Sequence, residues 1–157
     1  MRIEQCDPED AAVVADLWVS LAEEQTAYGS RVDPAANRAS VREAASRHAV
    51  AGGLLVARDP DVVGFVMFHV EDANGGQRRG SVENLYVTPA YRDRGIGSEL
   101  LARAERTLAD RGAAFVSLEA MADNADARRF YRRHGYELHR VHLEKPLESD
   151  NHSKDRG

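Results

Sequence analysis

Residues 81–98 read SVENLYVTPAYRDRGIGS and decide the fold, because a strand, a turn and the start of a helix follow one another within them. The valine, leucine and tyrosine content of residues 81–87 predicts a strand, and Pro89 stops it. After the turn, one apolar helical face is made by Ile96, Leu100, Leu101, Ala104 and Leu108, and Gly112 ends the helix. A tight turn needs only one glycine, whereas this turn holds Gly95 and Gly97 between arginines and a helix.

The excess of glycine and arginine is typical of a site that binds phosphate. The first N–H groups of a helix have no intrahelical partner, and the helix dipole places partial positive charge there. Glycine lets an anion approach the backbone, and Arg92 and Arg94 supply fork-shaped donors suited to phosphate oxygens. The alternative is an ordinary turn whose glycines only provide a positive φ, and the turn alone does not exclude it.

Two well-known phosphate loops do not match. The dinucleotide fingerprint requires a third glycine three residues after Gly97, where this chain has Leu100. The Walker loop requires glycine, lysine and then serine or threonine, a triplet that this sequence lacks.

Working outward, the remaining pattern predicts one domain with the element order β-α-α-β-β-β-α-β-α-β. We expect strands at 1–6, 113–120 and 136–147, and a hairpin over 52–70 that turns at Asp59–Asp61. We expect helices from Asp7 to about Glu24, from Asp33 to about His48 and from Asn124 to His134. The domain then covers residues 1–147, and the polar residues 148–157 are predicted to be a disordered tail.

Composition narrows the class of protein. The chain has 157 residues, 43% of them hydrophobic, which suits a single domain with a substantial core. Its net charge of −5 argues against a nucleic-acid partner. No apolar run could span a membrane and no signal sequence begins the chain, so we expect no membrane partner and a cytoplasmic location. Cys6 is the only cysteine, so no internal disulfide forms.

Two motifs together resemble the GNAT superfamily of N-acetyltransferases. Residues 92–97, RDRGIG, match its signature of Gln or Arg, two variable residues, Gly, one variable residue, then Gly or Ala. Residues 124–137, NADARRFYRRHGYE, resemble its second motif, in which an asparagine opens a short helix with a Phe-Tyr pair. The resemblance covers roughly residues 50–145.

The resemblance implies an α/β (α+β) fold. Its mixed, mostly antiparallel sheet has about six to seven strands flanked by about four helices. The sheet is splayed where strand 81–87 meets strand 114–120.

The resemblance also implies transfer of an acetyl group from acetyl-CoA to an amine, by direct attack in a ternary complex. The alternative is a CoA-binding sensor or interaction module with little catalysis. The cofactor-binding residues would be Leu85, Tyr86, Val87, Arg92, Asp93, Arg94, Gly95, Ile96, Gly97, Ser98, Asn124 and Tyr131. Residues 85–87 would pair with the pantetheine arm as an added strand does, and residues 94–98 would hold the pyrophosphate. Asn124 would contact the pantetheine, cap its helix, or do both.

Two residues are candidates for proton transfer. Tyr131 aligns with the general acid of the family, because a protonated phenol can donate to the leaving thiolate, although packing would also explain it. Glu83 is the candidate base, and it could instead bind the ammonium group of the acceptor. Strict alternation along the strand predicts Glu83 on the same face as Leu85 and Val87, with Asn84 on the other.

The sequence defines the binding site of the acceptor less well than that of acetyl-CoA. Glu23, Glu24 and Tyr28, together with Glu83, would contact an amine-bearing small molecule or peptide, although Glu23 and Glu24 would also suit a solvated helix end. No metal site is predicted, since the histidines lack HExxH spacing and His139 and His142 would lie on opposite faces of a strand. A homodimer is compatible with the resemblance.

Overall fold

The computed structural model describes residues 1–73 and 75–147. The predicted tail, residues 148–157, and Asn74 of the predicted turn lie outside these described residues. Over the described part, the strands are β1 (Arg2–Gln5), β2 (Leu54–Arg58), β3 (Val62–Asp72), β4 (Arg78–Val87) and β5 (Phe115–Leu118). The α-helices are α1 (Ala11–Thr26), α2 (Arg38–Ala51), α3 (Ile96–Asp110) and α4 (Ala125–Arg133). Short 3₁₀ turns lie at Pro8–Asp10, Ala35–Asn37 and Pro89–Tyr91.

The strands form one open, mixed sheet in the order β1-β2-β3-β4-β5. The pairs β1–β2, β2–β3 and β3–β4 are antiparallel, whereas β5 runs parallel to β4. The α3 crossover joins β4 to β5, as a parallel connection requires. The predicted mixed sheet with four helices is therefore confirmed.

The predicted number of strands was wrong. The described residues form five strands instead of six to seven, and residues 136–147 contain no strand. Their apolar side chains are largely exposed: Leu138, Val141, Leu143 and Leu147. Valine and other residues with strand propensity favour an extended backbone, but a strand also needs a neighbouring strand edge to bond to. The sequence pattern does not reveal whether such an edge is within reach.

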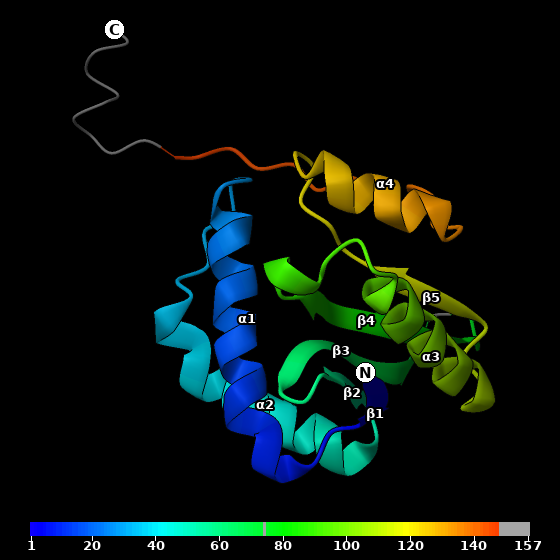
Figure 1. The fold of residues 1–157 in the computed structure, drawn as a ribbon. Coiled ribbons are helices and arrows are strands. Elements are labelled where there is room, and N and C mark those ends of the chain that lie inside the picture. The colour runs from blue at the N-terminus through cyan, green and yellow to red at the C-terminus, as the bar shows by residue number, and fades with distance from the viewer. Residues whose placement is uncertain (74, 148–157) are drawn as a thin grey trace, which may run out of the picture.

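Each face of the sheet is covered by its own apolar core. Figure 1 shows α3 on one face and α1 with α2 on the other. On the α3 face, Leu100, Leu101 and Leu108 pack fully buried against Val66 and Phe68. On the opposite face the buried set is Cys6, Ala11, Val14, Ala45, Leu54, Val56, Phe65, Met67 and Tyr86. The two cores hold the sheet rigidly between helices, so side chains near the middle of β3 and β4 have fixed positions.

Among the described residues, no helix is long and apolar enough to cross a membrane.

Candidate functional site

The ladder between β4 and β5 stops partway along β4. Parallel pairing runs from Arg79 opposite Phe115 to Val82 opposite Leu118. β4 then continues to Val87, and within the described ladder residues 83–87 have no partner in β5. The ladder therefore stops at the place where the splay was expected, since β5 ends at Leu118, and one edge of β4 has no strand partner in the described ladder before the chain turns toward α3.

A β-bulge lies at the same place. Met67 pairs with Asn84 and Phe68 pairs with Val82, so Glu83 is an extra residue that has no paired residue on β3. The bulge reverses the expected alternation. Leu85 and Val87 pack on the α3 side, whereas the carboxylate of Glu83 contacts His48 of α2 on the opposite face.

The predicted shared face of Glu83, Leu85 and Val87 was therefore wrong, because strict period 2 does not survive an inserted residue. Asn84 was expected on the face opposite Glu83. Both residues line the hollow described below, as Leu85 also does.

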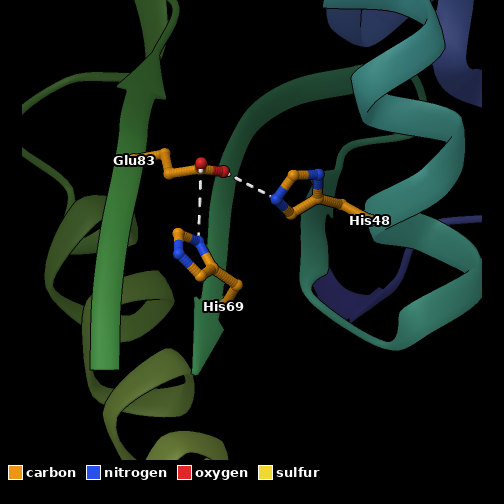
Figure 2. Close-up of side chains that lie close together, drawn as sticks. All are labelled: His48, His69 and Glu83. Atoms are coloured by element: carbon orange, nitrogen blue, oxygen red, sulfur yellow. Dashed lines mark ion pairs between the residues drawn. The ribbon is translucent and has the colours of Figure 1, made fainter. Parts of the chain in front are cut away.

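Glu83 lies between two histidines from two other elements (Figure 2). His48 Nε2 is 2.6 Å from Glu83 Oε2, and His69 Nδ1, from β3, is 3.4 Å from Glu83 Oε1. The hydrogen bond to His48 lowers the pKa of Glu83, and the same bond raises the pKa of His48, while partial burial opposes both shifts. Glu83 is therefore a charged carboxylate at neutral pH.

The ring nitrogen of each histidine that does not face Glu83 also has a polar neighbour. His48 Nδ1 is 2.8 Å from the carbonyl oxygen of Ala44, one turn back on α2. His69 Nε2 is 3.4 Å from Glu71 Oε2, and the guanidinium of Arg79 donates to the same Glu71 carboxylate. Each ring is thus held at both ends.

A small hollow of about 30 Å³ opens where β4 and β5 part, with room for one or two water molecules. Glu83, Asn84 and Leu85 line it from β4, and Tyr131 lines it from α4. The remaining lining residues are Leu21 and Gln25 of α1, Val82, Leu118 and Glu119. The structure therefore brings together the two residues predicted to transfer protons.

Tyr131 is held by aromatic neighbours. Its ring makes edge contacts with Phe130 and Tyr136, at centroid distances of 5.3 and 5.9 Å. Burial raises the pKa of Tyr131 to about 12, so the phenol carries its proton at neutral pH. Tyr131 packs against the core, as one of the two predicted roles requires, and it also lines the hollow, so its role as the acid stays a prediction.

α4 is fixed to the start of α3. Asn124 caps α4 by accepting a hydrogen bond from the N–H of Ala127 at 3.1 Å, as one of its two predicted roles requires. The ring of Phe130 lies over Gly97, and Ser98 Oγ is 2.9 Å from His134 Nε2. The second motif is thus packed onto the first, although about thirty residues separate them in sequence.

The turn before α3 has the backbone of an anion-binding loop. Asp93 has φ +63° and Gly95 φ +80°, and α3 begins directly afterwards at Ile96. No atom lies within 4 Å of the place where a Cβ on Gly95 would stand. The space beside Gly95 is therefore open, at the end of α3 where helix N–H groups have no intrahelical partner.

The two arginines of this loop contact different neighbours. Arg92 donates from Nε to the carbonyl oxygen of Val87 and from its terminal nitrogen to the Glu24 carboxylate, at 2.9 and 2.8 Å. The guanidinium of Arg94 lies 4.9 Å from the centre of the Tyr91 ring. Arg92 therefore ties the loop to α1, and Glu24, predicted to contact the acceptor, is occupied by this ion pair.

The other predicted acceptor residues lie near the end of α1. Glu23 is exposed on α1 and Tyr28 is partly exposed in the turn after it, and neither lines the hollow that holds Glu83. Gln25 of α1 does line it and was missed, as were His48 and His69. These residues come from separate elements with no shared spacing, so only the fold reveals their proximity.

Cys6 is remote from this chemistry. Its thiol is buried on the α1 and α2 face and donates to the carbonyl oxygen of Asp7 at 3.2 Å. Burial, reinforced by Asp10, raises the pKa of the thiol to about 11, so it is a poor nucleophile at neutral pH.

Comparison with known proteins agrees with this geometry. Residues 14–136 match the family model described as the acetyltransferase (GNAT) family, so the chain belongs to that family. Members of this family acetylate amines and generally use acetyl-CoA, and the chain spans less than two thirds of the length of the first curated relatives that it matches.

Two curated relatives share about a third or fewer of their aligned residues with this chain. An aminoalkylphosphonate N-acetyltransferase of Salmonella typhimurium is 36% identical over 97 residues, and the match spans 59% of this chain and 61% of that protein. An uncharacterized N-acetyltransferase of Bacillus subtilis is 27% identical over 139 residues, or 87% of this chain and 90% of that one. Several other curated relatives are matched over less than half of their length.

Solved structures show the same fold. A GCN5-related N-acetyltransferase from Ralstonia eutropha superposes with a TM-score of 0.74 at 24% identity, covering 93% of this chain and 97% of that one.

Proposed function

We propose that the chain transfers an acetyl group from acetyl-CoA to a primary amine of a small molecule or peptide, by direct attack in a ternary complex. One observation carries the proposal: Glu83 and Tyr131 border the same hollow, at the point where β4 parts from β5. In this proposal Glu83 would be the base for the amine and Tyr131 the acid for the leaving group, both at the same hollow.

The donor would lie along the first motif. The N–H groups of residues 94–98 suit the pyrophosphate, since the space beside Gly95 is open and the helix dipole of α3 favours negative charge there. The open edge of residues 85–87 suits the amide-bearing pantetheine arm, which would pair with it as an added strand. An N–H of this edge could also face the negative charge that develops on the carbonyl oxygen.

Proton transfer would use the two residues at the hollow. In the proposed reaction Glu83 accepts a proton from the ammonium group of the acceptor, and the resulting neutral amine attacks the thioester carbonyl. When the C–S bond breaks, Tyr131 donates its phenolic proton to the departing thiolate, and the proton that the new amide nitrogen loses restores the phenol. The contact with His48 keeps Glu83 charged and therefore able to accept. Burial keeps Tyr131 protonated and therefore able to donate.

For the acceptor, we propose an amine that also carries an anionic group. A second hollow of about 330 Å³ adjoins the histidine side of Glu83, and its lining includes Arg47, His48, His69 and Arg111. The rest of the lining is made up of Ala51, Gly53, Phe68 and Val70. The guanidinium groups of Arg47 and Arg111 would attract a carboxylate or phosphonate. The name of the Salmonella relative, aminoalkylphosphonate N-acetyltransferase, describes an acceptor of this kind.

The proposed function is tested by release of free thiol from acetyl-CoA across a panel of aminoalkylphosphonates, amino acids, polyamines, aminoglycosides and short peptides. We expect turnover with at least one amine, and the highest kcat/KM with an acceptor that bears an anionic group. A preference for polyamines would contradict the proposed acceptor class. Tight acetyl-CoA binding without thiol release for any amine of the panel would contradict the enzymatic proposal and favour a CoA-binding sensor.

Gly95 and Gly112 provide a matched pair, since both have a positive φ, of +80° and +90°, at opposite ends of α3. Replacing either with alanine should destabilise the protein by about 1–2 kcal/mol, because a Cβ disfavours the left-handed region. Only Gly95→Ala should also weaken acetyl-CoA binding, which calorimetry can measure. Equal affinities for the two variants would place the pyrophosphate elsewhere.

Tyr131→Phe removes the proposed acid while keeping the aromatic packing. We expect kcat to fall about 100-fold or more, with little change in acetyl-CoA affinity. Tyr136→Phe is the control, because its hydroxyl donates to Glu105 and does not line the hollow. Full activity in Tyr131→Phe would show that this phenol is not the acid.

Glu83→Gln keeps the size of the side chain and removes its charge. We expect kcat to fall about 100-fold or more, with a smaller change in the KM of the acceptor. A raised acceptor KM with unchanged kcat would mean that Glu83 binds the ammonium without taking its proton. Glu119→Gln, which alters another carboxylate of the same hollow, should stay active; loss of activity there instead would transfer the role to Glu119.

A further inference from the structure

We propose that His48, His69 and Glu83 form a binding site for a divalent transition-metal ion of the Zn²⁺ class. Two imidazoles and a carboxylate are ligands that such ions accept, and the three come from α2, β3 and the bulge of β4. One ligand atom from each lies within 4.8 Å of the other two. This site goes beyond acetyl transfer, and the argument for it needs only the positions of the three side chains.

The distances suit a single ion after small side-chain rotations. Ligands bound at about 2.0–2.2 Å around a tetrahedral ion lie about 3.3 Å apart. His69 Nδ1 and Glu83 Oε1 are already 3.4 Å apart. His48 Nε2 and Glu83 Oε2, now at 2.6 Å, would have to separate by several tenths of an ångström, as a proton between them is replaced by a metal.

The far side of each imidazole supports this assignment independently. Histidines that bind metal usually donate their other ring N–H to a carbonyl or a carboxylate, which fixes the tautomer and the ring orientation. Here His48 Nδ1 faces the carbonyl oxygen of Ala44 at 2.8 Å, and His69 Nε2 faces the Glu71 carboxylate at 3.4 Å. The nitrogens nearest Glu83 are thus directed at its carboxylate (Figure 2). The other nitrogen of each ring has an acceptor of its own.

The surroundings leave the ion accessible. The side chains of His48, His69 and Glu83 are between 19 and 37% exposed, so an ion could enter without unfolding the protein. Three protein ligands leave at least one coordination position for water or an oxygen of a bound molecule, as catalytic zinc sites do. The hollow lined by His48, His69, Arg47 and Arg111 adjoins this position, so an anionic oxygen could reach the ion from there.

The test is direct metal binding to the full chain, prepared without a polyhistidine tag and stripped with a chelator. Co²⁺ is titrated into the protein, and its visible absorption reports coordination by protein ligands. We expect one Co²⁺ per chain, displaced by Zn²⁺. His48→Gln, His69→Gln and Glu83→Gln should each weaken binding more than about tenfold, and Glu71→Gln, which removes only an outer partner, should weaken it about tenfold.

A double variant, His139→Gln with His142→Gln, is the matched control, because these histidines lie outside the cluster and His142 also neighbours a carboxylate, Glu144, at 3.0 Å. It should bind Co²⁺ as the unmodified chain does. The proposal fails if the unmodified chain does not bind, if the control loses binding, or if His48→Gln and His69→Gln bind normally. Circular dichroism confirms that each variant is folded, and since no acetyl transfer is measured, failure here leaves the proposed function untouched.

Discussion

The end of the β4–β5 ladder at Val82 and Leu118 is the constraint on which the rest of the site depends. Beyond this pair β4 keeps its antiparallel bonds to β3 and loses its neighbour on the other side. An unpaired strand edge is costly unless something satisfies its backbone groups. The parting also makes the hollow that Tyr131 and Glu83 share, and the proposed pantetheine position would satisfy the open edge.

The bulge at Glu83 places a carboxylate close to the end of the β4–β5 ladder. One extra residue moves the carboxylate off the face of Leu85 and toward His48 and His69. Three different species would then use the same oxygens: a proton, the ammonium group of an acceptor, and a divalent ion. The contact with His48 keeps the carboxylate charged, and by lowering the pKa of Glu83 it also makes that group a weaker proton acceptor. How the chain balances these uses depends on the histidines as much as on Glu83.

Local features of the site could be predicted from the sequence, whereas its long-range features could not. The loop before α3 and the cap at Asn124 follow from residues adjacent in the chain, and the structure has both. The bulge was missed because the alternation of residues along one strand does not reveal its pairing register with the neighbouring strand. His48 and His69 were missed because twenty residues of chain separate them and only the sheet brings them to Glu83. The last strand was predicted over residues 136–147, and a local sequence pattern cannot supply an edge for it to pair with.

The most direct measurement of the central claim is amide hydrogen exchange with and without acetyl-CoA. If the donor lies in the parting of β4 and β5, acetyl-CoA should slow exchange in residues 85–87 and 95–98, and leave β1 and β2 unchanged. Unchanged exchange in both segments at saturating acetyl-CoA, or protection confined to other parts of the chain, would contradict the account.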